Sequence, residues 1–327
     1  MIYLTHRHRL QKLRRRMMRR LALPAPAFKF VNTDEVLSGT DVLLRRTGTG
    51  LEVGLHPLTG HRDVLLRYTV GEKYVPFLHY FTQCDPSVTS VMCNASDGDF
   101  PSAARFSFSS FSKDVIPLPD LYFFRQSGYA DLRDKVAQSQ IPWRDRCDKI
   151  VWRGGPNGNG LQSYASEVST HPSVRHRIRM AWVCRHSEID FRFVYQKRDP
   201  YAAVARRAGF VGERIPVTEW MGKKYAIDID GFTNAWDNLY HRLLMGCCVL
   251  KVQSELGFRQ WYYDALKPYE HYVPVKADFS DLFEKVDWVR SNPRQAEQIA
   301  AAGQALAHSM TFESETARAV QWMTEHA

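Results

Sequence analysis

The sequence predicts an α/β protein of two domains, and three observations support this fold class. The chain has 327 residues, enough for two domains of about 150 residues each. In its C-terminal half, strand-like and helix-like segments alternate, a pattern typical of a parallel sheet with helices on both faces. Glycine-containing turns follow two of these strands, at the edge where such sheets bind ligands. We place the domain boundary near residue 145, where prolines interrupt the pattern.

The individual elements follow from hydrophobic runs and from the residues that interrupt them. In the N-terminal half, β-like runs at 41–44 and 63–70 are separated by glycine turns. In the C-terminal half, short apolar runs predict strands at 149–152, 189–195, 225–229, 247–252 and 271–275. Helices are expected between the first two of these strands, around 239–244, and at 258–266, 281–290 and 293–309.

The charge of the chain is basic, with a formal net value of +9. Nucleic acid, an anionic membrane surface and a phosphate-bearing substrate would each match it, and so would a solvated basic surface without a partner. The segment at 6–23 has leucines and methionines at near-helical spacing among arginines. It predicts a basic helix that lies on anionic lipid or packs on its own domain.

Compartment is predicted from cysteines and from hydrophobic runs. The six cysteines form no CxxC pair and show no metal-ligand spacing, so we expect reduced, mostly buried thiols in a cytoplasmic protein. No apolar run approaches the ~18–20 residues of a membrane span. No apolar region follows the N-terminal arginines, so we expect no secretory signal.

The first candidate site is Val151–Gly155, at the end of a predicted strand. Arg153 stands beside Gly154 and Gly155, and an arginine next to glycines that let backbone approach suits a diphosphate. The segment matches neither the dinucleotide-binding nor the P-loop pattern. A tight turn with an exposed arginine is the alternative interpretation.

The second candidate site is the run from Lys223 to Asp237, in which a strand leads into Asp-Gly and a polar loop opens a helix. The N–H groups at that helix start suit phosphate or ribose oxygens. Asp228 and Asp230 have the spacing of a metal-binding DxD pair, but no further ligands can be identified, and structural carboxylates at strand ends are the commoner case.

The third candidate site begins with His271 and Tyr272, at the start of the last predicted strand. Both side chains are placed to point into a cleft, whereas a lone histidine in such a position is more often structural.

Three segments together resemble the Rumi-like protein O-glucosyltransferases, which belong to glycosyltransferase family 90. They are the Trp-Arg-Gly turn at 152–154, the Lys-Tyr-(x)4-Asp-Gly run at 224–231 and the Leu-(x)-Pro-(x)2-His-Tyr-Val-Pro-Val run at 266–275. The family also includes fungal capsule-associated enzymes and bacterial lipopolysaccharide core transferases. Segments at 234–237, 243–252 and 278–288 resemble the bacterial branch most closely, and the whole match runs in order over 105–305.

The resemblance implies a GT-B fold, in which two Rossmann-like domains face each other across a cleft. It assigns 1–145, with the basic N-terminal helix, to the acceptor side, and 146–327, with the closing helices, to the nucleotide sugar. It also implies a UDP-sugar donor, no metal or other cofactor, and inversion at the anomeric carbon. One carboxylate then takes the proton of the acceptor hydroxyl while the diphosphate leaves from the opposite face.

In the family, the catalytic base is an aspartate just upstream of a Phe-Ser-Phe-Ser-like segment. Here 106–109 has that sequence, and Asp97 and Asp99 precede it. Asp97, which a glycine follows, is the first choice as base and Asp99 the second. A polar Asp-Gly turn without a catalytic role is the alternative.

On the donor side, the resemblance gives Arg153 the role of neutralising the departing diphosphate. The other residues expected around the nucleotide are Trp152, Gly154, Gly155, Lys224, Tyr225, Asp230, Gly231, Asn234, Ala235, Trp236 and Arg242. Animal members carry a second arginine early in the helix after Asp-Gly, where this chain has Trp236 and Asp237. Arg242, Lys223 or Lys224 is the expected substitute.

The predicted function is therefore transfer of glucose, galactose or xylose to an acceptor hydroxyl of a lipopolysaccharide-core or other surface glycan, or of a lipid-linked sugar. We expect this to occur in the cytoplasm, at the inner face of the membrane. A degenerate member that binds a nucleotide sugar without turnover is the first alternative, because of the missing arginine. A nucleic-acid-binding protein is the second, and the absence of a helix-turn-helix, RNP or zinc pattern argues against it.

Overall fold

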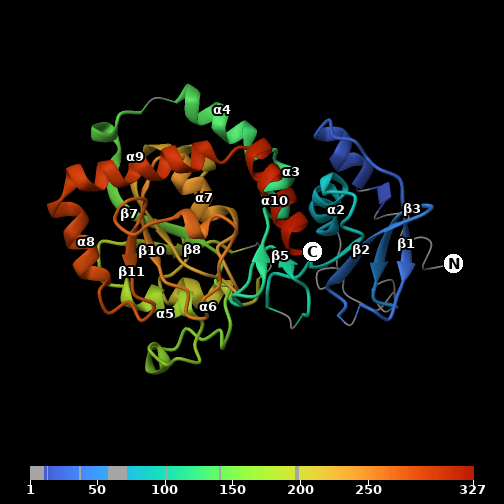
Figure 1. Cartoon of the computed structure of the whole chain (residues 1–327). Coiled ribbons are helices and arrows are strands. Elements are labelled where there is room, and N and C mark those ends of the chain that lie inside the picture. Colours follow the sequence, from blue (N-terminus) through green and yellow to red (C-terminus); the bar gives the residue numbers. More distant parts are fainter. Residues whose placement is uncertain are drawn as a thin grey trace. The chain divides into compact units, whose positions relative to one another are not determined.

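The computed structural model describes residues 11–12, 14–36, 38–57, 72–99, 102–139, 141–195 and 199–327. The chain folds into two compact units (Figure 1). Unit 1 comprises Met1–Ala130, Phe258–Tyr263 and Met310–Ala327, and unit 2 comprises Asp131–Gly257 and Asp264–Ser309. The division thus falls at 130/131 rather than at 145/146, and two later segments return to unit 1.

Unit 2 is built on a five-stranded sheet in which every pair of neighbours is parallel. Its order is β11-β10-β9-β7-β8, and all five strands were expected from the alternating pattern. The strands are β7 Cys147–Gly154, β8 Asp190–Phe193, β9 Lys223–Asp228, β10 Cys248–Val252 and β11 Val273–Val275. The α/β class is confirmed here.

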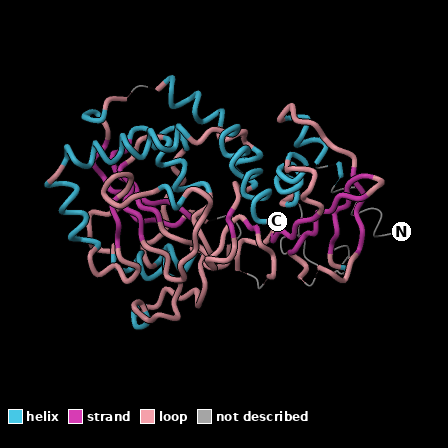
Figure 2. The backbone as a smooth tube through the Cα atoms, viewed as in Figure 1, coloured by secondary structure: helices cyan, strands magenta, loops and turns pink. Residues whose placement is uncertain are grey.

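The helices of unit 2 are α4 Ala130–Gln138, α5 His176–Val183, α6 Ala202–Arg207, α7 Asp237–Leu244, α8 Leu282–Ser291 and α9 Pro293–Ser309, with 3-10 turns at Trp143–Asp145, Ser166–Val168 and Val217–Gly222 (Figure 2). Apolar residues of α5, α6, α8 and α9 are buried in one core with those of the sheet. In the core, the ring of Trp152 stacks on Phe191, with centroids 4.1 Å apart. Planar stacking of this kind fixes the end of β7 against β8.

One expected helix is absent, and another is shorter than expected. The helix at 258–266 is absent; only the 3-10 turn Tyr263–Ala265 forms there, because Phe258–Tyr263 belongs to unit 1, where Arg259 pairs with Ser110. Between β7 and β8, the α-helix is limited to α5, because the preceding glycine-rich loop has positive φ at Gly158 and Gly160.

Unit 1 contains a six-stranded sheet of order β1-β3-β2-β4-β5-β6, which mixes parallel and antiparallel pairs. The strands are β1 Phe28–Asn32, β2 Asp41–Thr47, β3 Gly50–Leu55, β4 Ser90–Asn94, β5 Phe106–Ser107 and β6 Ile116–Pro117. β2 and β3 form a hairpin whose turn uses the positive φ of Gly50, and antiparallel pairing follows from this short connection. The expected strand at 41–44 is confirmed as part of β2, and the run at 63–70 lies outside the described residues.

The helices of unit 1 are α2 Tyr74–Gln83, α3 Leu121–Arg125 and α10 Phe312–His326, together with the helical residues 14–20. α10 packs against α2 although the whole of unit 2 separates them in the sequence. Met17 and Met18 are buried, so the described part of the basic N-terminal helix packs its apolar side within unit 1. Within the described ranges, no helix is both long and apolar enough to cross a membrane.

Candidate active site

The carboxyl ends of the strands in unit 2 bring two of the predicted loops together. β7 ends at Gly154 and leads into the glycine-rich loop, while residues 229–236 connect β9 to α7. Asn159 of the first loop donates a hydrogen bond from Nδ2 to the carbonyl oxygen of Phe232 in the second (2.9 Å). These loops lie at the edge where parallel sheets bind their ligands.

Arg177, on α5, connects the same two loops through its guanidinium. It donates to the carbonyl oxygens of Asp230 (2.8 Å), Ile229 (2.9 Å) and Gly155 (3.1 Å). Its side chain is buried and lies over the ring of Trp152, 5.2 Å from the centroid. Burial lowers the pKa of Arg177 to about 10, which keeps it charged at neutral pH. Arg177 therefore fixes the backbone of the candidate donor site.

Arg177 was not among the residues expected at the site, although the sequence contains a signal for it. Arg175, Arg177 and Arg179 alternate through the start of α5. Arg175 donates to the carbonyl oxygen of Pro156 (3.1 Å), and Arg179 pairs with Glu255. An arginine run at the start of an apolar helix, directly after a glycine-rich loop, is the pattern that indicates this role.

The two aspartates of the second candidate site have different surroundings. Asp228 is fully buried; its Oδ2 lies 3.3 Å from Lys251 Nζ, and its Oδ1 accepts from Asn238 (3.3 Å). Asp230 is also buried, and burial raises its pKa to about 6. The Lys251 ammonium thus supplies a positive charge beside this pair. In the part of the chain that the structure describes, no group of three or more metal-ligating His, Cys, Asp or Glu side chains occurs.

The loop after Asp230 enters α7 through a strained residue. Trp236, which precedes the helix, has φ +52° and ψ −120°. Asn234 and Ala235 are buried, and Gly231 packs so close to Arg177 that an added Cβ would lie 3.3 Å from its Nη2. Asp237 occupies the first turn of α7, where the animal members place their second arginine. The first turn of α7 therefore offers backbone N–H groups but no arginine or lysine side chain.

Arg153 lies at the carboxyl end of β7, but its guanidinium is turned toward β8. It donates to the carboxylate of Asp190 (2.7 Å), to the carbonyl oxygen of Asp190 (2.8 Å) and to that of Glu213 (3.0 Å). A diphosphate contact from Arg153 therefore requires that it exchange some of these partners.

Three residues expected around the nucleotide lie near the other end of β9. Lys224 pairs with Asp148, and the hydroxyl of Tyr225 donates to the carbonyl oxygen of Val289 (3.3 Å). At ~3.3 Å per residue, Lys224 is about 13 Å along the strand from Asp228. Arg242 stacks on Trp220, 3.4 Å from its ring centroid, in the turn that precedes β9. The structure does not bring these side chains, or Lys223 at the first position of β9, to the edge that carries Asp230.

His271 has a structural role. Its Nδ1 accepts a hydrogen bond from the backbone N–H of Lys267 (3.0 Å), and its side chain is buried. This fixes the turn that leads into β11, in agreement with the structural alternative for this residue.

In unit 1, Asp97 and Asp99 follow β4. Asp97 forms an ion pair with Lys73, at the start of α2. Gly98 has φ +93° and lies against the carbonyl oxygen of Ser109, which an added Cβ would approach to 2.4 Å. The segment that holds Asp99 therefore packs directly against the Phe-Ser-Phe-Ser segment.

Asp99 lines a cavity of about 320 Å³ whose other residues include five serines and one exposed aromatic ring. Partial desolvation raises the pKa of Asp99, and the neighbouring charge of Asp97 acts in the same direction. The remaining residues of the cavity wall are Asn94, Gly98, Ser102, Ala104, Ser107, Ser109, Ser110, Phe111, Ser112 and Val115. A carboxylate with a raised pKa in a cavity is the arrangement expected of a general base.

Parts of the chain are similar in sequence to known proteins. The chain is 31% identical over 177 residues to uncharacterized protein 179R of Invertebrate iridescent virus 6, which is 48% of this chain and 15% of that protein. It is 34% identical over 118 residues to protein O-glucosyltransferase 3 of Mus musculus, which is 36% of this chain and 22% of that protein. The matched region thus spans less than a quarter of the length of either relative.

Among solved structures, that of Anabaena Alr3699/HepE in complex with UDP and glucose matches with 12% sequence identity and a TM-score of 0.34, over 60% of this chain and 51% of that one. A family model described as glycosyl transferase family 90 matches residues 105–317, which include the Trp-Arg-Gly turn and the Asp-Gly loop. Because this match covers more than half of the 327 residues, the chain belongs to glycosyl transferase family 90, a family of glycosyltransferases.

Proposed function

We propose that the protein transfers a sugar from UDP to a hydroxyl group of a saccharide acceptor, with Asp99 as the general base. The observation that supports this choice of base is the difference between the two aspartates. Asp97 is held by Lys73, whereas Asp99 lines a hydroxyl-rich cavity and has a raised pKa. A base must be free to take a proton, so the order of preference between the two is reversed relative to the sequence analysis.

The cavity also supports a saccharide as acceptor. Phe111 exposes 61% of its surface and packs edge-on against Phe258, with centroids 5.4 Å apart. The hydroxyl oxygens of Ser110 and Ser112 accept hydrogen bonds from the backbone N–H groups of Ser112 (3.0 Å) and Asp114 (3.2 Å). The hydroxyl protons of the two serines can therefore be donated to a ligand. An aromatic surface beside hydroxyl donors suits a sugar ring, which has apolar faces and a polar rim. We propose that the sugar carried by the donor is glucose, galactose or xylose.

On the donor side, we propose that the loops held by Arg177 contact the nucleotide through their backbone. The N–H groups between Gly231 and Ala235, at the start of α7, suit the ribose and diphosphate. Lys251 and Arg153 supply positive charge near the same edge. Transfer without a metal ion follows if these groups neutralise the leaving diphosphate.

The test is a donor screen in the presence of EDTA. UDP-, GDP- and ADP-sugars are incubated with the protein, and nucleotide release and thermal stabilisation are measured. We expect one UDP-sugar to stabilise the protein. Asp99→Asn should keep this stabilisation and lose about 10²–10⁴-fold in transfer, and Asp97→Asn, the matched control, should lose much less. Equal losses in the two variants, or stabilisation by GDP- or ADP-sugars alone, would contradict the proposal.

A second candidate function, nucleotide-sugar binding without turnover, is favoured by one observation. The guanidinium of Arg153 is already engaged by Asp190 and Glu213, and Arg242 stacks on Trp220. Stabilisation by a UDP-sugar with no nucleotide release from the wild-type protein under any condition would support this alternative. Loss of stabilisation in Arg153→Ala would show that Arg153 exchanges its partners when the donor binds.

We further propose that the protein works at an anionic membrane surface in the cytoplasm, on a lipid-linked or lipopolysaccharide-core acceptor. The N-terminal helix supports an electrostatic contact rather than insertion, since Met17 and Met18 are buried while Arg15, Arg16, Arg19 and Arg20 are exposed. Such a contact weakens with salt. Cosedimentation with anionic liposomes tests it: glutamine at the four arginines should abolish binding, and unchanged binding would refute the proposal.

A further inference from the structure

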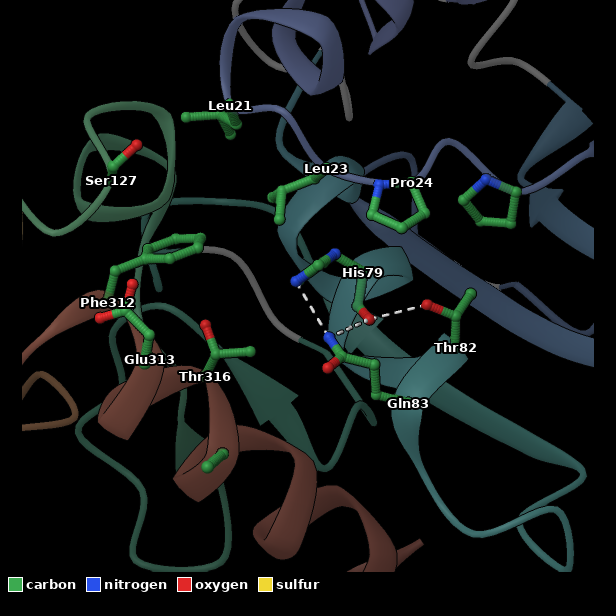
Figure 3. A pocket seen from close by; sticks show the side chains of 12 residues that line it. Leu21, Leu23, Pro24, His79, Thr82, Gln83, Ser127, Phe312, Glu313 and Thr316 are labelled. Atoms are coloured by element: carbon green, nitrogen blue, oxygen red, sulfur yellow. Dashed lines mark hydrogen bonds between the residues drawn. The ribbon is translucent and has the colours of Figure 1, made fainter.

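Unit 1 contains a second and larger cavity, of about 710 Å³, that is not the one lined by Asp99. It lies between the segment after the N-terminal helix, α2 and α10 (Figure 3). The residues that line it are Leu21, Leu23, Pro24, Pro26, His79, Thr82, Gln83, Ser127, Phe312, Glu313, Thr316 and Ala317. Its volume falls within the range of about 300–1,000 Å³ found for small-molecule sites.

The wall of this cavity is largely apolar. Leu21, Leu23 and Pro24 line it from one segment, and the ring of Phe312 faces it from α10 (Figure 3). Burial of apolar ligand surface against such a wall is favourable because it removes that surface from water. The site therefore favours a ligand whose body is a hydrocarbon chain or ring.

Two polar groups give the cavity a hydrogen-bonding end. His79 Nε2 lies 2.9 Å from Nε2 of Gln83, and since that amide nitrogen can only donate, His79 accepts there and carries its proton on Nδ1. In Figure 3 the second ring nitrogen of His79 points away from Gln83, toward Leu23. The buried hydroxyl of Thr316 has no hydrogen-bond partner among the described residues. An oxygen of a ligand would satisfy these donors.

The charges at the cavity disfavour an anionic ligand. The residues that line it include neither lysine nor arginine, and the one carboxylate is that of Glu313. Burial lowers the pKa of His79 to about 4, so this ring is neutral at neutral pH. A carboxylate or phosphate headgroup would meet no positive charge here and would lie near a negative one.

We propose that this cavity is a binding site for an uncharged lipid-type molecule, one with an apolar chain and a hydroxyl, ester or ether oxygen. His79 and Thr316 hold the oxygen, and the wall of leucine, proline and phenylalanine holds the chain. The inference does not depend on the proposed transferase function, because the cavity is separate from the one that Asp99 lines and its test requires no turnover.

The test uses thermal unfolding of the full chain with two probes of equal chain length, n-decanol and n-decanoate. We expect decanol to raise the Tm of the wild-type protein by about 3 °C or more at saturation, and decanoate to leave it unchanged at pH 7.5. Ala317→Phe fills the cavity and should abolish the shift. The matched control is Gln321→Phe, an exposed position of α10 that does not line the cavity, and it should keep the shift.

Three results would overturn the proposal. The first is a shift by decanoate as large as that by decanol, because the site would then accept an anion. The second is a decanol shift that survives in Ala317→Phe, since binding would then occur elsewhere. The third is binding that appears only after residues 1–10 are deleted, which would assign the cavity to the chain's own N-terminal segment.

Discussion

The contacts of Arg177 lead to a prediction for the Arg177→Met variant. Methionine retains apolar packing over Trp152 but donates no hydrogen bond. The carbonyl oxygens of Ile229 and Asp230 are buried and would lose their guanidinium donor. Leaving a buried acceptor unpaired costs about 1–3 kcal/mol, so the variant should lose about 2–6 kcal/mol of its free energy of unfolding.

The assay is urea denaturation followed by circular dichroism, with the free energy taken by linear extrapolation. Arg206→Met, an exposed arginine on α6, removes the same charge and side chain and should change stability by no more than about 0.5 kcal/mol. Binding of the donor nucleotide should also weaken at least about tenfold, measured where the variant is still folded, because Arg177 fixes the Gly155 and Asp230 backbone.

The reasoning would be refuted if Arg177→Met were as stable as Arg206→Met and bound the nucleotide as tightly as the wild-type protein. Such a result would mean that water replaces the guanidinium at both carbonyl oxygens and that the loops keep their positions without it. A loss of stability with unchanged nucleotide binding would separate the two roles and refute only the second.

Three further predictions follow from single contacts. Gly98→Ala places a Cβ 2.4 Å from the carbonyl oxygen of Ser109 at φ +93°, so transfer should fall at least about tenfold while donor-induced stabilisation is unchanged; equal transfer rates would show that the segment relaxes freely. Asp99 must be ionised to act as base, and desolvation raises its pKa, so kcat/KM should fall as the pH drops through a pKa above the ordinary 3.8. The Asp99→Asn variant should lack this step in its pH profile. Because the fold favours the neutral carboxyl of Asp99, the stability that this group contributes is lost as the pH rises through the same range. Lys251→Met leaves the fully buried Asp228 without its ion-pair partner and should cost about 3–5 kcal/mol in urea denaturation, part of which the added Asp228→Asn change should restore; a neutral effect of Lys251→Met alone would contradict this account.

Unit 2 could be predicted from the sequence because each of its strands is a short apolar run that a helix or loop separates from the next. Parallel order and burial on both faces follow from that alternation, and so does the edge at which Asp230 lies. The bounds of α9 were also expected, since a proline begins it and its apolar residues have helical spacing.

Unit 1 was harder to predict because its sheet is assembled from pieces that carry little pattern. β5 and β6 have two residues each, and β1 pairs with β3 rather than with β2, which follows it in the sequence. Long-range pairing of this kind leaves no local signal. The side chains of the site were predicted only in part for a similar reason: the side on which Arg153 finds its partners depends on Asp190, which lies on the neighbouring strand β8.

The division of the chain has a consequence for how members of the family can be recombined. Unit 1 is discontinuous, and the backbone passes from one unit to the other at 130/131, 257/258, 263/264 and 309/310. A chimera that exchanges unit 2 at a single splice point would separate α10 from the α2 it packs against. A functional graft must therefore carry 131–257 and 264–309 into a host that keeps its own counterparts of 258–263 and 310–327.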